Sequence, residues 1–193
     1  MRIAWPLAAL ALTCCGPRPT TDPSAPAPAI TEPDLAAINA MERPAAASAS
    51  DRAGTHCAEG EAVVFSCAIE GKTASVCVGP TTVNYRYGPL GAPELQIAST
   101  GVDGRTHVSD LFGAGGGRQS AVRFSSDGYN YIVRAMVAGQ LTDVPGEAFA
   151  GITVLRGDTT VSSSECADPE QHQFSTADIP AQGETDERYD AWW

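Results

Sequence analysis

The sequence predicts an all-β fold over residues 56–166: a small antiparallel β-sandwich or barrel of about eight or nine strands, cross-linked by disulfides. Short runs rich in β-branched and aromatic residues recur about every ten residues, separated by Gly, Asp, Asn and Pro. Side chains within several runs alternate between two faces, as from Tyr129 to Met136. The sequence offers no helix of useful length between these runs, so alternating strand and helix folds are disfavoured.

The turn residues set the ends of each expected strand. Glu70-Gly71, Asp127-Gly128 and Gly157-Asp158 are typical of tight turns between antiparallel strands. The expected strands are 61–69, 72–78, 83–87, 94–99, 106–112, 120–125, 129–137, 151–156 and 159–164. This number of strands is enough to close a barrel or form two sheets, which protects the strand edges.

Residues 1–15 have the organisation of a bacterial export signal. Arg2 precedes an uncharged apolar run that is too short to span a bilayer as a helix. The sequence from Leu12 to Cys15 resembles the lipobox of bacterial lipoproteins, which implies lipid attachment at Cys15, with Cys14 as the alternative. Because Gly16 follows instead of Asp, the resemblance implies anchoring on the periplasmic side of the outer membrane.

Two segments outside the β-domain are poor in core-forming residues. Residues 16–55 form a Pro/Ala/Ser-rich tether, with apolar residues at helical spacing before Pro44 that predict one short helix. Residues 167–193 are acidic and are predicted to be disordered. They end in Trp192 and Trp193, whose role the sequence leaves open.

Cys57, Cys67, Cys77 and Cys166 remain once the signal and the lipidated cysteine are removed. An even number in an exported chain predicts two disulfides. Cys67 and Cys77 flank the Gly71 turn, which favours a Cys67–Cys77 bond with Cys57–Cys166, although four cysteines allow three pairings. Zinc is disfavoured because no close cysteine pair is present.

The charge and the motifs argue against nucleic acid binding and catalysis. The net charge is −11 and Lys72 is the only lysine, whereas binding a phosphate backbone needs clustered cations. An acidic surface instead favours encounter with a basic protein. His56, His107 and His172 lie in no triad or metal motif, so no catalytic residue, metal or cofactor is predicted. The glycine-rich loop 113–118 fits no phosphate-binding motif and is interpreted as a mobile loop at the rim of a binding site.

A polar loop leading to Tyr129 and Arg134, spaced as Tyr-x-x-x-x-Arg, resembles a motif of the periplasmic inhibitors of invertebrate-type lysozyme. The resemblance implies that Tyr129 and Arg134 enter the lysozyme active-site cleft, with Ser120 and Arg123 assisting. The family's Ser-Gly-x-Tyr motif is replaced around Ser120, and Tyr129 and Arg134 point to opposite faces of a regular strand unless a bulge intervenes. The alternative interpretation is purely structural: Tyr129 and Tyr131 form a core or cross-strand aromatic pair, and Arg134 lies on a solvated face.

The predicted function is therefore an envelope-anchored, non-enzymatic binding module for a protein partner, with inhibition of a basic lysozyme as its specific form. The alternative is a structural or interaction lipoprotein of the envelope without inhibitory activity. The membrane is contacted through the lipid anchor alone.

Overall fold

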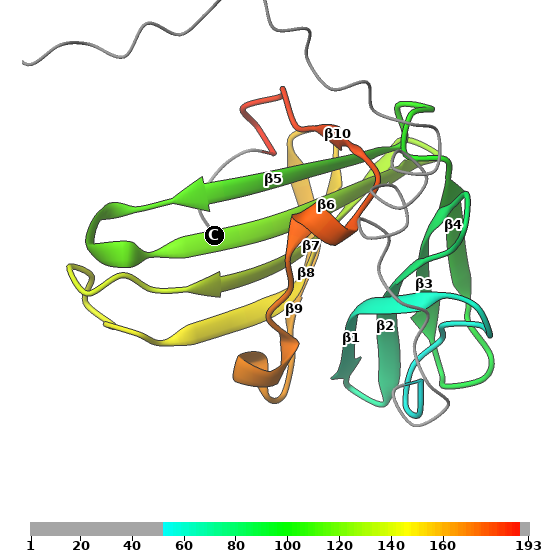
Figure 1. Ribbon diagram of the computed structural model, residues 1–193, viewed down its shortest axis with the longest axis horizontal. Coiled ribbons are helices and arrows are strands. Elements are labelled where there is room, and N and C mark those ends of the chain that lie inside the picture. Colours follow the sequence, from blue (N-terminus) through cyan, green and yellow to red (C-terminus); the bar gives the residue numbers. More distant parts are fainter. Residues whose placement is uncertain (1–51, 190–193) are drawn as a thin grey trace, which may run out of the picture. The chain divides into compact units, whose positions relative to one another are not determined.

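The structure is a computed structural model that describes residues 52–189 (Figure 1). It consists mainly of β-strands joined by turns. Several of the predictions fall on residues that the structure does not describe. These are the predicted export signal 1–15 with its lipidated Cys15, the predicted short helix, most of the predicted tether, and Trp192 and Trp193. Within residues 52–189 the strands are β1 (Ala62–Ile69), β2 (Lys72–Val78), β3 (Val83–Gly88), β4 (Leu95–Ser99), β5 (Thr106–Phe112), β6 (Arg118–Ser126), β7 (Tyr129–Val137), β8 (Ala148–Arg156), β9 (Thr159–Glu165) and β10 (Gln182–Gly183). Three 3₁₀ turns accompany them: η1 (Ala114–Gly116), η2 (Pro169–His172) and η3 (Thr176–Asp178). The all-β prediction is confirmed.

The strands form two sheets. The small sheet has the antiparallel order β1-β2-β3-β4, and the large sheet has the order β10-β5-β6-β7-β8-β9. Strands β5 to β9 are antiparallel neighbours in chain order, whereas β10 joins the edge of β5 in parallel. Asp127 and Gly128 both adopt positive φ between β6 and β7, as a two-residue hairpin turn requires.

One core lies between the two sheets, so the architecture is a sandwich. Val76, Val83 and Tyr85 of the small sheet pack in the same buried cluster as Val122 and Phe124 of the large sheet. The rings of Tyr85 and Phe124 stack with their centroids 5.4 Å apart. The strands of the two sheets cross at a steep angle (Figure 1).

Two disulfides form, as predicted, but the favoured pairing is wrong. The bonds are Cys57–Cys77, with Cα atoms 5.4 Å apart, and Cys67–Cys166, at 5.6 Å. The hairpin turns between Ile69 and Lys72, so Cys67 lies opposite Ala74 and not opposite Cys77. Cys67 faces the core and reaches Cys166 after β9, while Cys77 bonds to the segment that precedes β1.

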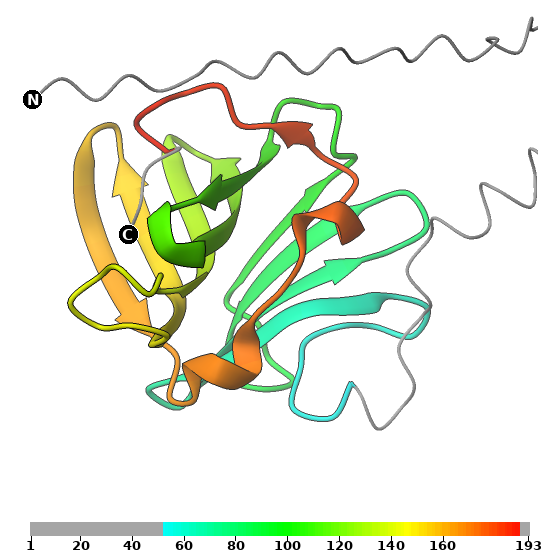
Figure 2. The same cartoon turned by 60° about the vertical axis from the view of Figure 1, so that its left-hand side comes forward.

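The predicted disorder of residues 167–193 is wrong for residues 167–189. Figure 2 shows this orange-to-red segment running across the open side between the two sheets. Phe174 packs edge-on against Phe65, with centroids 5.7 Å apart, and Ile179 lies in the core. A Cβ at Gly101 would lie 1.6 Å from the carbonyl oxygen of Pro180, so the segment passes directly over a glycine. A few well-placed apolar contacts thus order a segment whose overall composition suggests disorder.

Candidate functional site

The outer face of the large sheet, which points away from the sandwich core, carries two of the four predicted partner-binding residues, Arg123 and Arg134. In β6 the residues alternate, so Val122 and Phe124 enter the core while Ala121 and Arg123 face outward. Ala121 lies opposite Arg134 of β7, and Arg134 lies opposite Gly151 of β8. The outer face is partly buried, because the end of the described chain folds over it.

The structure separates Tyr129 and Arg134. Strand β7 pairs with β6 and β8 in unbroken register, so the five-residue spacing places the two side chains on opposite faces. Tyr129 packs beside Tyr131, at 6.4 Å between centroids, and beneath the guanidinium of Arg156. The geometry does not support the joint insertion of Tyr129 and Arg134 into one cleft.

Ser120 also faces inward, where it has a structural contact. Its hydroxyl donates to Oδ1 of Asp110 at 2.7 Å, and the other oxygen of that carboxylate accepts from the hydroxyl of Thr176 in η3. Ser120 therefore helps to hold the C-terminal segment against β5.

Arg123 is fully engaged within the protein. Its Nε donates to Glu184 at 2.6 Å, and its other nitrogens contact Ser125, Asn130 and His107. Burial favours a higher pKa for the Glu184 carboxyl, but the hydrogen bonds from Arg123 and the local backbone outweigh it and lower that pKa. This arginine ties the C-terminal segment to the sheet and is not available for a partner.

Arg134, in contrast, is buried, and no ion pair or side-chain hydrogen bond joins it to another of the described residues. It is 8% exposed, and its Nε has no hydrogen bond. No carboxylate of residues 52–189 forms an ion pair with it. Burial lowers the pKa of its guanidinium. A buried unsatisfied donor is unfavourable, so the Nε of Arg134 lowers the stability of this part of the sheet.

Beside Arg134, an apolar groove of about 580 Å³ opens at one end of the large sheet. Met136 and Phe149, which lie opposite each other in β7 and β8, line it together with Leu141, Val144 and Glu165. Of these lining residues, Leu141 is 78% exposed and Val144 is 42% exposed. The groove thus has one carboxylate and an apolar lining that is partly exposed.

The glycine-rich loop 113–118, which the sequence suggested as the rim of a binding site, lies on one side of this groove. Gly113 and Gly117 line it, and the Gly115 carbonyl accepts a hydrogen bond from the Gln140 amide at 2.8 Å. A Cβ at Gly115 would lie 2.8 Å from the backbone nitrogen of Leu141, so glycine permits the loop to pack against the β7–β8 connection. That connection, the opposite side of the groove, was not predicted as part of a site. Its signal in the sequence is two apolar residues, Leu141 and Val144, within a stretch rich in turn residues.

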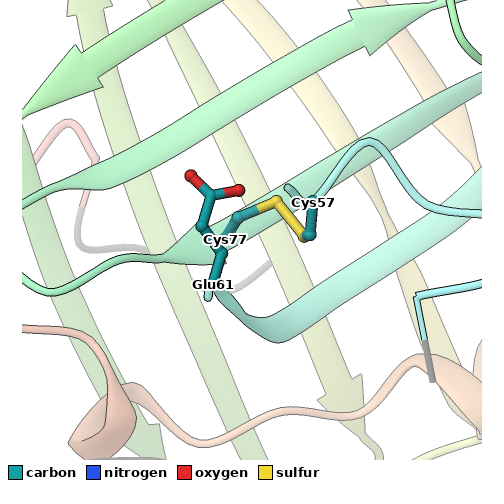
Figure 3. Close-up of side chains that lie close together, drawn as sticks. All are labelled: Cys57, Glu61 and Cys77. Carbon is teal, nitrogen blue, oxygen red and sulfur yellow. A yellow bond between two sulfur atoms is a disulfide. The ribbon is translucent and has the colours of Figure 1, made fainter. Parts of the chain in front are cut away.

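A second cluster lies on the small sheet, where Cys57, Glu61 and Cys77 approach one another (Figure 3). The two cysteines are bonded to each other and offer no thiolate. Both oxygens of Glu61 accept from Arg86, at 2.6 and 2.9 Å. Burial favours a higher pKa for Glu61, but Arg86 and other hydrogen bonds lower it. The cluster fastens the segment before β1 and is not a metal site.

No family model, curated protein or solved structure was found to match this chain. Among residues 52–189, no helix has the length and apolar character needed to cross a membrane. The candidate site is therefore defined by its own geometry.

Proposed function

We propose that this protein is an envelope-anchored, non-enzymatic binding module that recognises a protein partner through the apolar groove at the end of the large sheet. The observation that carries the proposal is the groove itself, with the exposed apolar residues Leu141 and Val144 in its lining. Exposed apolar surface around a concave site is typical of interaction sites. The lipobox-like sequence at Cys15 supports placement at the envelope.

The partner chemistry that fits is a basic protein with an exposed apolar segment. The net charge of −11 favours rapid encounter with a basic surface, while the groove supplies apolar burial. A basic lysozyme, which the Tyr-x-x-x-x-Arg resemblance implies, belongs to this class. Inhibition would then act through the groove, since Arg134 is buried and Tyr129 faces away from it.

Two matched variants test the proposal. Leu141→Asp places a charge beside the groove, and Val102→Asp places the same charge at a residue of nearly equal exposure, 76%, in the loop before β5. Lysis of cell walls by c-type, i-type and g-type lysozymes is followed by turbidity, and direct binding to each lysozyme is measured by calorimetry. We expect binding that Leu141→Asp abolishes and Val102→Asp preserves.

The outcomes separate the candidate functions. Binding with slowed lysis supports an inhibitor, and binding without slowed lysis supports an interaction module. Binding that both variants retain equally would place the contact away from the groove and contradict the proposal. If none of the three lysozymes binds, the lysozyme form of the proposal is excluded.

A further inference from the structure

The edge of the small sheet at β1 carries a second hollow, separate from the apolar groove. Strand β1 is an outer strand in the order β1-β2-β3-β4 (Figure 1). The hollow has a volume of about 460 Å³ and is lined by six consecutive residues of this strand, 63–68. A hollow on one face of a sheet would be lined by alternate residues. One that is lined by every residue follows the edge of the strand.

The backbone groups that face this edge follow from the hairpin between β1 and β2. Residues 70–71 both adopt positive φ and Ile69 is paired with Lys72, as in a two-residue hairpin turn. The closing pair of such a turn exchanges hydrogen bonds, and along the strand bonded and non-bonded pairs then alternate. Ser66 and Ala68 fall on the non-bonded positions, so their N–H and C=O groups point outward. Within the described part of the chain, no backbone hydrogen bond reaches these groups.

Two segments flank this edge on opposite sides of the small sheet. On the core side, η2 contacts β1, and the ring of His172 lies edge-on to that of Phe65 with centroids 6.1 Å apart. On the outer side, the Ser66 hydroxyl donates to the carbonyl of Gly54. Both segments line the hollow. The edge is therefore recessed between two walls, and a single extended chain is the shape that fits it.

The walls and the charge indicate what kind of chain this is. Paired strands lie about 4.8 Å apart, and the β1 edge of a second copy would bring its own two walls against those of the first. A free extended segment carries no such walls. Asp168 is the only acidic or basic residue of the lining apart from His172, and the net charge is −11. The electrostatics therefore favour a basic segment.

We propose that an extended, basic segment of a partner protein adds to β1 as a further strand of the small sheet. Its backbone bonds to the outward groups of Ser66 and Ala68. Its alternate side chains contact Phe65 and η2 on one side of the sheet and residues 53–54 on the other. This contact lies on a different sheet from the apolar groove and does not depend on the proposed function.

Amide hydrogen exchange in the isotope-labelled full chain tests the edge. In the free protein, the amides of Ser66 and Ala68 should exchange about tenfold or more faster than those of Phe65 and Cys67, which bond to β2. Adding the synthetic peptide Lys-Thr-Val-Thr-Val-Thr-Lys should slow the exchange of Ser66 and Ala68. The same peptide with methylated backbone nitrogens cannot donate hydrogen bonds and should protect neither. Protection of both amides before peptide is added would overturn the inference, because the chain itself or a second copy would then cover the edge.

Proline substitution distinguishes strand addition from other modes of binding. Ala68→Pro removes an outward N–H group and no bond to β2, so the fold should remain and peptide binding should weaken about tenfold or more. Thr160→Pro is the matched control, because Thr160 holds the equivalent position beside the turn in β9, at the edge of the large sheet. Thr160→Pro and Leu141→Asp should both bind the peptide as the parent does. Equal binding to Ala68→Pro and the parent, or no binding to the parent, would overturn the inference.

Discussion

Removing the Cys67–Cys166 disulfide should cost more stability than removing Cys57–Cys77, and the difference follows from the two loop lengths. The bonds close sequence separations of 99 and 20 residues. In the chain-entropy model they stabilise the fold by about 4.7 and about 3.3 kcal/mol. Cys67 and Cys166 also belong to the main core, so their replacement by Ala adds a packing loss of about 1 kcal/mol or more. Because small domains have about 5–15 kcal/mol of total stability, the Cys67→Ala/Cys166→Ala chain should be close to unfolding.

Mass mapping of the unreduced protein establishes the pairing, and urea unfolding of the two double variants gives the free energies. Parent protein reduced with dithiothreitol is the control, and it should be less stable than either double variant. A linked peptide containing Cys67 and Cys77 would refute the pairing. Four free thiols in protein purified from the periplasm would refute the argument from compartment as well. Equal stability of the two double variants would refute the reasoning from loop length.

Three further predictions concern the C-terminal segment and the N-terminus. Gly101→Ala should destabilise the fold by roughly 3 kcal/mol or more in thermal unfolding, because its Cβ would clash with the backbone of the C-terminal segment. Gly104→Ala is the control: it is also at positive φ but has open space around it, so it should cost only about 1 kcal/mol. Glu184 has a lowered pKa in the folded protein, so its ion pair with Arg123 stabilises the fold above the unfolded pKa of 4.5 and is lost as pH falls below it. The difference in unfolding free energy between parent and Glu184→Gln should therefore shrink below about pH 4.5, and a constant difference would contradict this. Metabolic labelling with a lipid analogue should mark the parent and not Cys15→Ser; unchanged label would indicate Cys14, and an unlabelled parent would exclude lipidation.

The strands were predictable because their signals are local. Strands 72–78, 106–112 and 129–137 have the bounds predicted from alternation and turn residues. Strand β8 begins at Ala148, three residues before the predicted start, because pairing with β7 extends it through Ala148 and Ala150, which have low strand propensity. Strand β10 was not predicted, because a strand of two residues shows no periodicity in the sequence. It pairs with β5 only because other contacts of the C-terminal segment place it there.

The candidate site was predictable in part. The loop 113–118 was interpreted as the rim of a binding site from its flexibility and Arg118; its Gly113 and Gly117 line the groove, whereas Arg118 is not among the lining residues. Arg134 was identified from a motif, but the structure buries it instead of presenting it to a cleft. Arg123 was assigned to a partner, yet Glu184, 61 residues away in sequence, holds it.

The sequence by itself determined the all-β class, the turns, and two disulfides from four cysteines, because alternation, turn chemistry and cysteine count are properties of short segments or of composition. The tertiary structure decided which cysteines pair, which face of the large sheet each arginine occupies, and where residues 167–189 lie. Each of these depends on how strands distant in sequence come together, and a shift of one residue in register changes the neighbours of every side chain. The groove has the same origin, since Met136, Phe149 and the two loops beside them meet only when β7, β8 and β9 are assembled.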